Sequence, residues 1–352
     1  MSRTAPHSGE FRLLVKPTGE VVAPDLAAPL LPILHAVGNR DDLPSTERIA
    51  CPVETPKLTI ARLPAIDLSA GDLPSLSTAE LWCIHKAALD GSLPRNCRQG
   101  ASLLDVKTEL GRRMLRRCHL CRRRCKVDRI VGRSGFCELT QEANVAGYSM
   151  LYNEGPLVGQ PTFGVFLGGC SLRCGFCYRS QDLHPRKCQQ STPKKIASLL
   201  DQAADAGAES WHFLGGNPDQ SLVAVLESLR HVRRSLPIVW NSALYLSRKA
   251  IELLKGIVDV WVPDLKFGND ACAHRLAGVQ YYSSVVRRNL LVLRGENFVV
   301  VRHMRYPGHE SCCETVVRRW LKKNLPAAIH HFLDYCALAD NAMQSEFQLE
   351  QG

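Results

Sequence analysis

Apolar and polar positions follow two alternating patterns in the second half of the chain. Short apolar runs rich in β-branched or aromatic residues predict buried strands at residues 161–169, 209–216, 237–241, 258–265 and 297–304. Between them, residues 193–207, 220–236, 247–256 and 271–291 have the apolar spacing of amphipathic helices. This alternation predicts an α/β fold with a parallel sheet and right-handed crossovers. In such sheets, functional residues gather at the carboxyl ends of the strands.

The regions on either side have weaker patterns. Two apolar runs around residues 17–19 predict a hairpin, and residues 75–94 predict a helix that Ser77 or Thr78 caps and Gly91 ends. Near the other end, residues 314–325 and 326–338 both have helical spacing. We therefore predict a partly helical extension over residues 1–110, a cysteine-rich segment over 111–158, a core over 159–336 and a polar tail over 337–352.

The composition fits a globular protein with one large domain and appendages, at 352 residues, 45% hydrophobic and 22% charged. No run of about 18 uncharged apolar residues occurs, and the first ten residues lack the apolar core of a secretion signal. We therefore expect a cytoplasmic protein without membrane contact. The cytosol keeps thiols reduced, so metal or redox chemistry is the leading use for some of the 15 cysteines.

Basic residues concentrate in one stretch of the chain. The formal net charge is +10, and between Arg112 and Arg133 ten Lys or Arg residues stand against one acid, Asp128. Such a run can attract nucleic acid or an acidic protein. Charge runs more often form a solvated face, so we expect no nucleic-acid partner.

Three cysteines follow the first predicted strand of the core. Cys170, Cys174 and Cys177 form the pattern C-x3-C-x2-C on a short loop. Iron–sulfur clusters take thiolate ligands, and a cubane held by three of them leaves its fourth iron open for a substrate or cofactor. A zinc site usually has a second pair of Cys or His residues at a distance, which this loop alone does not supply.

Glycine and polar residues follow the later predicted strands. They are Gly215, Gly216 and Asn217, then Asn241 and Ser242, then Asp264 and Lys266, and finally Arg302. Two adjacent glycines let a backbone approach a ligand closely. A turn or a helix cap would explain each of these groups if it stood alone. Their order after the cysteine loop makes them candidate ligand contacts.

The cysteine loop resembles the C-x3-C-x-aromatic-C signature of the radical S-adenosylmethionine superfamily, with Phe176 at the aromatic position. The resemblance implies a partial (β/α)6 barrel and a 4Fe-4S cluster on the three cysteines. It implies that the open iron binds S-adenosylmethionine, with Phe176 near the adenine. Reduction, with reduced flavodoxin or ferredoxin as electron donor, would then release a 5′-deoxyadenosyl radical that abstracts hydrogen from a substrate.

The later strand ends extend this resemblance. Gly215 to Pro218 resemble the superfamily's GGEP motif, which meets the methionine moiety of the cofactor, although Asn217 stands where an acid is common. The segments with Asn241, Ser242, Asp264, Lys266 and Arg302 resemble those of glycyl-radical-enzyme activases and of pyruvate formate-lyase-activating-enzyme-like proteins. There the matching positions lie near the cofactor, some through a monovalent cation. The resemblance covers roughly residues 118–335, so the long N-terminal region departs from it.

A second cysteine group precedes the core. Cys118, Cys121, Cys125 and Cys137 lie within twenty residues, and four thiolates fit either a closed zinc site or an auxiliary iron–sulfur cluster. The spacing does not choose between the two. A similar cysteine-rich entry occurs in the activase-like group. The remaining cysteines have no ligand-like grouping beyond the adjacent Cys312 and Cys313, and we expect buried structural thiols there.

Three functional hypotheses follow. The first is a radical enzyme that abstracts hydrogen from a glycine of a partner enzyme. The second is a radical enzyme that modifies another protein, peptide or small molecule, with residues 1–110 presenting the substrate. The third is a metal-stabilised nucleic-acid-binding or regulatory protein, which would have no use for three thiolates that leave one iron open.

Overall fold

The computed structural model describes residues 14–15, 21–22, 50–92, 99–152, 154, 157–177, 180 and 182–334. The chain divides into two compact units, Met1–Glu47 and Arg48–Gly352, which are treated separately. In the first unit, β1 (Leu14–Val15) pairs antiparallel with β2 (Val21–Val22), which confirms the predicted hairpin. The predicted tail lies outside the described residues.

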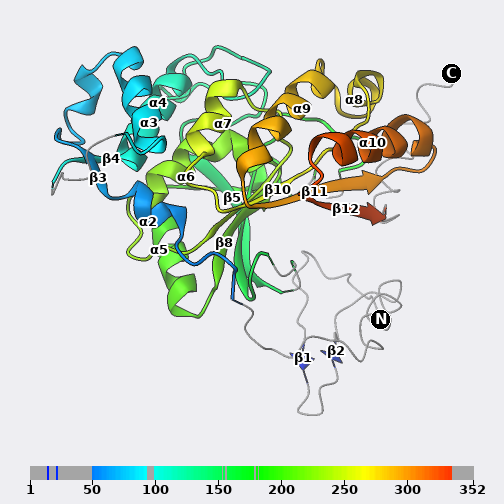
Figure 1. The fold of residues 1–352 in the computed structure, drawn as a ribbon, viewed down its shortest axis with the longest axis horizontal. Coiled ribbons are helices and arrows are strands. Elements are labelled where there is room, and N and C mark those ends of the chain that lie inside the picture. Colours follow the sequence, from blue (N-terminus) through cyan, green and yellow to red (C-terminus); the bar gives the residue numbers. More distant parts are fainter. Residues whose placement is uncertain are drawn as a thin grey trace, which may run out of the picture. The chain divides into compact units, whose positions relative to one another are not determined.

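An eight-stranded sheet organises the second unit (Figure 1). Its strand order is β12-β11-β10-β9-β8-β6-β5-β7. Six neighbouring strands pair in parallel, namely β12, β11, β10, β9, β8 and β6. At the β6 side of this series, β5 pairs antiparallel with β6, and β7 pairs antiparallel with β5. This parallel series confirms the predicted partial (β/α)6 barrel. The strands are β5 (Ala143–Leu151), β6 (Thr162–Leu167), β7 (Gln189–Ser191), β8 (Ser210–Gly215), β9 (Ile238–Ser242), β10 (Val260–Pro263), β11 (Phe298–Arg305) and β12 (Ile329–Asp334).

Helices connect the consecutive parallel strands. They are α5 (Pro193–Asp205), α6 (Leu222–Leu229), α7 (Arg248–Leu254), α8 (Asp270–Ala277), α9 (Tyr282–Val292) and α10 (Thr315–Asn324), the last preceded by a π-helical turn, η6 (Glu310–Glu314). Short 3-10 turns are η3 (Pro185–Lys187), η4 (Pro218–Ser221) and η5 (Leu293–Gly295). The single helix predicted over residues 271–291 is two helices, because Gly278 takes a left-handed conformation with φ of 59° and ends α8.

One predicted element is wrong. Residues 326–338 have helical spacing, yet Ile329–Asp334 form strand β12, which pairs in parallel with β11. Ile329, Phe332 and Leu333 are spaced as on a helix face, but the next open edge of the sheet lies beside them. Hydrogen bonds between β11 and β12 satisfy the backbone N–H and C=O groups of both strands. Pairing with β11 therefore outweighs the local helical spacing of residues 326–338.

The start of the second unit is a small helical layer. It contains α2 (Lys57–Ala61), η2 (Leu73–Ser75), α3 (Thr78–Leu89) and α4 (Leu103–Arg116), with β3 (Pro64–Ile66) pairing antiparallel with β4 (Ala101–Ser102). Ser77 and Glu80 form the predicted capping box of α3. Helix α4 runs through residue 110 and packs on α6, so the predicted boundary at that residue falls inside a helix of the sheet-containing unit.

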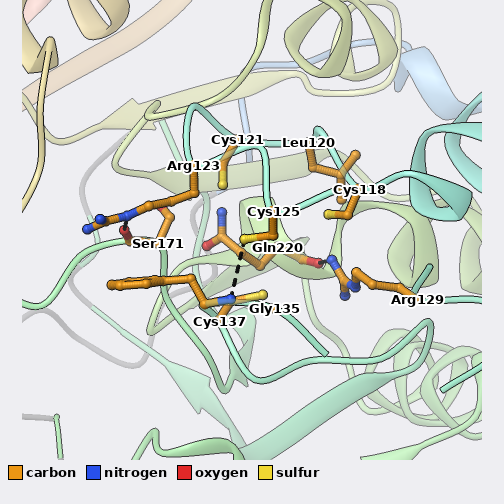
Figure 2. Close-up of a pocket in the computed structure, with 11 residues that line it drawn as sticks. Cys118, Leu120, Cys121, Arg123, Cys125, Arg129, Gly135, Cys137, Ser171 and Gln220 are labelled. Atoms are coloured by element: carbon orange, nitrogen blue, oxygen red, sulfur yellow. Dashed lines mark hydrogen bonds between the residues drawn. The ribbon is translucent and has the colours of Figure 1, made fainter. Parts of the chain in front are cut away.

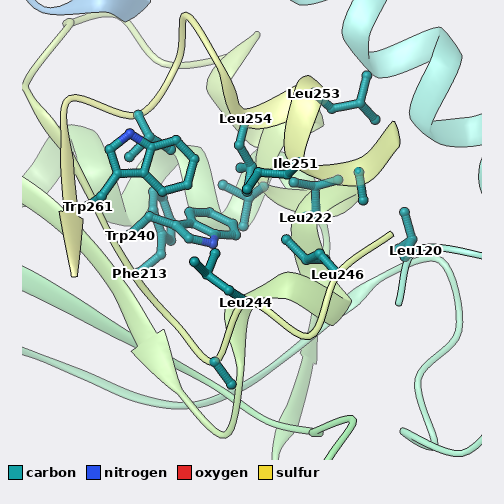
Figure 3. Close-up of a cluster of buried hydrophobic side chains, with 14 of the residues drawn as sticks. Leu120, Phe213, Leu222, Trp240, Leu244, Leu246, Ile251, Leu253, Leu254 and Trp261 are labelled. Carbon is teal, nitrogen blue, oxygen red and sulfur yellow. The ribbon is translucent and has the colours of Figure 1, made fainter. Parts of the chain in front are cut away.

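The core lies between the sheet and its covering helices. Phe213, Trp240 and Trp261 come from three adjacent strands and pack beside Ile251 and Leu254 of α7 (Figure 3). Successive side chains of a strand point to opposite faces. Trp240 therefore faces the helices, and Asn241 faces the other side of the sheet. Among the described residues, no helix is long and apolar enough to cross a membrane.

Candidate active site and cysteine centres

A cleft of about 930 Å³ opens at the carboxyl ends of the parallel strands. Nearly all residues predicted to hold the cluster and the cofactor line it, namely Cys170, Cys174, Cys177, Phe176, Gly215, Gly216, Asn217, Asn241, Asp264, Lys266 and Arg302. Ligand sites have volumes of about 300–1,000 Å³, so the cleft can hold a nucleoside-sized molecule with a substrate beside it. The predicted site residues thus meet at one place in the fold.

The three-cysteine loop leaves β6 and is fixed by backbone hydrogen bonds to distant segments. The Gly169 N–H donates to the Leu183 carbonyl at 3.0 Å, and the N–H groups of Arg173 and Gly175 donate to carbonyls at the end of α8, each at 3.0 Å. Burial raises the pKa of the Cys170 thiol to about 11, although a backbone N–H and the charge of Lys266 oppose it. Such thiols ionise when a metal replaces their protons.

The two glycines after β8 bring the backbone close to that loop. Gly215 has a φ of 118°, which side chains other than glycine rarely adopt. A Cβ on Gly216 would lie 2.6 Å from the Gly169 carbonyl oxygen, which forbids a side chain there. The next residue, Asn217, is buried, and its Nδ2 has no partner among the described residues. An unpartnered buried amide that lines a cleft is a group suited to bind a ligand there.

An ion-pair network occupies the strand ends opposite the cysteine loop. The Asp264 carboxylate accepts from Lys266 Nζ at 2.9 Å and from Arg302 Nε at 3.3 Å. Burial alone would raise the pKa of Asp264, but the charges of Lys266 and Arg302 outweigh it and hold that pKa below its usual value. Burial likewise opposes the charge on Lys266, but Asp264 outweighs it and raises the Lys266 pKa. The cleft therefore presents fixed charges of both signs.

Aromatic side chains form one wall of the cleft. The ring of Phe176 lies 4.5 Å from that of Tyr306 and 6.0 Å from that of Phe267, measured between centroids. Phe267 in turn packs against Tyr282, whose hydroxyl accepts from the Lys266 backbone N–H at 2.7 Å. The wall thus joins Phe176 to the segment that carries Lys266. The sequence interpretation missed Tyr306, although it follows a predicted strand end closely.

Ser242 lies behind the cleft, outside its lining. The Ser242 hydroxyl is buried and donates to Asp219 Oδ1 at 2.6 Å, which also accepts from Trp240 Nε1 at 3.0 Å. Burial raises the pKa of Asp219 to about 6, although these hydrogen bonds oppose the shift. Asp219 directs Ser242 away from the cleft, and no sequence motif marked it.

The second cysteine group encloses a much smaller space, of about 10 Å³. Cys118, Cys121, Cys125 and Cys137 approach it from separate points of the segment, with Gln220 beside them (Figure 2). The space has room for about one water molecule, so no substrate fits there. Both polar atoms of the buried Gln220 amide lack partners among the described residues.

Two arginines of the basic run make internal contacts, whereas six of its ten basic residues are exposed, namely Arg112, Arg116, Arg117, Arg124, Lys126 and Arg133. The Arg129 guanidinium is 1% exposed and donates to the carbonyls of Thr140 and Gln220. Arg123 donates to the Ser171 carbonyl at 3.0 Å and lies 3.7 Å from the ring of Phe136. Arg123 therefore fixes the cysteine-rich segment onto the three-cysteine loop, and Arg129 fixes it onto the turn η4.

Known proteins resemble this chain in sequence and in fold. A family model described as the Radical SAM superfamily matches residues 165–312. The protein called "Uncharacterized protein MJ0674" of Methanocaldococcus jannaschii is 34% identical over 272 residues, which is 73% of this chain and 79% of that protein.

Two solved structures of Streptococcus suis SuiB are similar over part of the chain. SuiB bound to precursor peptide SuiA is 18% identical with a TM-score of 0.36, over 51% of this chain and 44% of SuiB. SuiB bound to S-adenosylmethionine is 19% identical with a TM-score of 0.35, over 51% of this chain and 46% of SuiB. This chain thus matches less than half the length of SuiB.

Proposed function

Because the chain belongs to the radical S-adenosylmethionine superfamily, we propose that Cys170, Cys174 and Cys177 hold the 4Fe-4S cluster and that the cleft binds S-adenosylmethionine beside it. The observation that carries this proposal is that the three thiols, the unpartnered Asn217 amide and the Asp264 ion pairs all line one cavity. Bound there, the cluster and S-adenosylmethionine would supply one-electron reductive cleavage to methionine and a 5′-deoxyadenosyl radical, with reduced flavodoxin or ferredoxin as the electron donor, and the radical would take a hydrogen atom from the substrate.

The residues around the cleft fit the parts of this cofactor. Asn217 Nδ2 can donate to the carboxylate of the methionine moiety. The absence of a side chain at Gly216 lets the end of β8 pack against the backbone of the three-cysteine loop. Phe176 and Tyr306 offer ring surfaces for the adenine. Asn241 lines the same cleft and adds an amide to this set.

The charged groups opposite the loop would orient the cofactor. Lys266 and Arg302 share one carboxylate, so the group carries a net positive charge next to the cleft. Asp264 can accept hydrogen bonds from the ribose hydroxyls of S-adenosylmethionine, and Lys266 and Arg302 can donate to its carboxylate. A monovalent cation at Asp264 can take the place of a direct contact between Asp264 and the cofactor.

Within this proposal the substrate is a protein glycine, another peptide position or a small molecule. Glu138 lies at the edge of the cleft beside three basic side chains. Its carboxylate oxygens lie 3.8 Å from Arg173 NH2, 3.5 Å from His184 Nε2 and 3.3 Å from Arg186 Nε. Arg186 is 84% exposed in its side chain, so the rim offers a positive charge to an approaching partner. This supports a substrate or electron donor with an acidic contact surface, as reduced flavodoxin or ferredoxin would be.

The second cysteine group would hold an auxiliary metal centre. Four thiols, the buried positive charge of Arg129 and the unpartnered Gln220 amide face one enclosed space. The guanidinium offsets the charge of thiolate ligands, and the amide can donate to a sulfur. Iron and zinc analysis of C121S against the parent protein distinguishes an iron–sulfur cluster from zinc.

Anaerobic reconstitution tests the main proposal. The parent protein, given dithionite and S-adenosylmethionine, should form 5′-deoxyadenosine, whereas C170A, C174A and C177A should form none. The matched control is C83S, which changes an exposed thiol on α3 and should behave as the parent. No product from the reconstituted parent, with the three loop variants behaving identically to it, would refute the enzyme and leave the binding hypothesis.

A second measurement identifies the hydrogen donor. With a candidate partner enzyme present, activation of a glycine should give a glycyl radical signal in electron paramagnetic resonance. With a deuterated peptide or small molecule, deuterium should instead appear in 5′-deoxyadenosine. Cleavage without either result would reject the candidate substrate while leaving the proposed cofactor chemistry intact.

A further inference from the structure

Four side chains outside both cysteine centres converge on one point. Cys272, His309, Cys312 and Cys313 each offer one ligand atom, and these atoms all lie within 4.8 Å of one another. Cys272 Sγ lies 3.7 Å from Cys312 Sγ and 3.5 Å from His309 Nδ1, and His309 Nδ1 lies 3.3 Å from Cys312 Sγ. Neither the cleft nor the smaller cysteine space includes these residues in its lining.

The three distances among Cys272, His309 and Cys312 are close to those expected around one tetrahedral metal ion, and Cys313 Sγ lies within 4.8 Å of the same atoms. Zinc bonds to sulfur at about 2.3 Å and to imidazole nitrogen at about 2.0–2.1 Å, so tetrahedral ligand atoms lie about 3.8 Å apart for two sulfurs and about 3.6 Å apart for sulfur and nitrogen. Three cysteines and one histidine are a ligand set of structural zinc sites. The ligands stand as C-x36-H-x2-C-C in the sequence, in two segments of the fold.

Neighbouring groups pack closely around the cluster. Asn269 Nδ2 lies 3.3 Å from Cys272 Sγ and also donates to the Cys312 carbonyl at 2.9 Å. Gly268 approaches so closely that a Cβ there would lie 2.6 Å from the Cys313 Cα. Arg275 NH2 lies 3.4 Å from His309 Nε2, so its charge stands beside a centre that three thiolates and one Zn²⁺ would leave at about −1.

We infer that Cys272, His309, Cys312 and Cys313 form a structural zinc site. Four protein ligands complete the tetrahedron, so the ion has no open position for catalysis. The site joins the start of α8 to the π-helical turn η6. These segments follow the strand ends that carry Lys266 and Tyr306, and His309 packs 6.4 Å from the Tyr306 ring. The zinc ion would hold two walls of the cleft in place.

A disulfide between Cys272 and Cys312 is the competing explanation for the short sulfur distance. It would need only two of the four residues, and it gives no reason for an imidazole nitrogen and a third thiol to converge on the same point. The zinc site accounts for all four.

Zinc content of the purified full-length chain tests this inference. C272S, C312S and H309A should each lose about one zinc ion per chain relative to the parent, whereas H309C, which replaces imidazole by a thiolate, should retain it. C83S should retain all zinc, and C121S should retain this ion whatever metal the other cysteine group holds. Retention in H309C separates a lost ligand from a damaged fold, as do unchanged circular dichroism spectra.

Three results would overturn the inference. One is equal zinc content in the parent, C272S and C312S. Another is a Cys272–Cys312 disulfide in peptides mapped after anaerobic alkylation. The third is equal loss of zinc from H309A and from C83S, which would mark unspecific binding. None of these depends on cleavage of S-adenosylmethionine, so the zinc site and the proposed function can fail separately.

Discussion

Asp219 is a buried carboxylic acid whose replacement by asparagine should stabilise the protein at neutral pH. It has no exposed surface, and its Oδ1 accepts from Ser242 and from Trp240. Its Oδ2 has no partner among the described residues. Asp219→Asn keeps an oxygen for both hydrogen bonds and puts the amide nitrogen where the unpartnered oxygen stands. The substitution therefore removes a buried charge and keeps the hydrogen bonds from Ser242 and Trp240, while it changes the contact of the carboxylate with the Asn217 side chain.

The raised pKa gives the size of the effect. Burial raises the Asp219 pKa from 3.8 to about 6 in the folded protein, a shift of about 2 units. One unit corresponds to about 1.4 kcal/mol, so ionisation of Asp219 costs the folded state about 3 kcal/mol. Because the folded pKa is raised, this cost is absent below pH 4, grows as the pH rises from about 4 to about 6, and is constant above that range.

Urea unfolding of the parent and of D219N at a series of pH values measures this difference. D219N should have a higher free energy of unfolding at pH 7.5 by up to about 3 kcal/mol, and the two proteins should converge near pH 4. The control is D67N, an exposed residue whose substitution should change stability little at any pH. A D219N protein that is less stable than the parent at pH 7.5, or a difference that does not vary with pH, would refute the reasoning.

Three other substitutions test separate parts of the structure. G216A puts a Cβ 2.6 Å from a carbonyl oxygen and should weaken S-adenosylmethionine binding roughly tenfold in equilibrium dialysis, whereas G147A, with nothing within 4 Å, should not. R129M removes the buried guanidinium beside the second cysteine group and should lower its metal affinity roughly 10- to 100-fold in competition with a chelator; unchanged affinity would exclude the charge effect. S77A breaks the capping box of α3 and should lower the free energy of unfolding by about 1 kcal/mol in urea, without change in 5′-deoxyadenosine formation.

Much of the fold could be predicted from the sequence because strand and helix periods alternate strongly in it. The parallel strands β6, β8, β9, β10 and β11 lie within about two residues of the predicted runs, whereas β7 was not predicted. Strand β5 was missed because Ala143–Leu151 mixes glycine, asparagine and serine with its apolar residues, so neither period stands out. Strand β12 was assigned as a helix because its strand conformation depends on hydrogen bonds to β11, and the local sequence pattern carries no information about that pairing.

Residues of the candidate site were predictable where a short sequence motif, a glycine pair or a strand end marks them. The cysteine loop, the glycine pair and Asp264 could be placed because parallel strands end at one edge of the sheet. Ser242 was misplaced because strand residues alternate between faces, and it follows Asn241, which faces the cleft. The cluster around Cys272 was missed because its ligands come from segments about 40 residues apart, which only the folded chain brings together.

The two cysteine centres share walls that are one residue thick. Ser171 lines the smaller space, while its neighbours Cys170 and Leu172 line the cleft. The segment from Asn217 to Gln220, at the start of η4, also separates the two spaces, because Asn217 lines the cleft and Gln220 lines the smaller space.

The buried position of Asp219 follows from this arrangement. It lies within η4 and accepts hydrogen bonds from Trp240 and Ser242 of β9, so it ties the shared wall to the rigid sheet. An exposed carboxylate would cost less but could not make those bonds. The free energy lost by burying the Asp219 carboxylate therefore accompanies the hydrogen bonds that fix η4 to β9. D219N should be more stable than the parent only if it keeps the hydrogen bonds from Trp240 and Ser242.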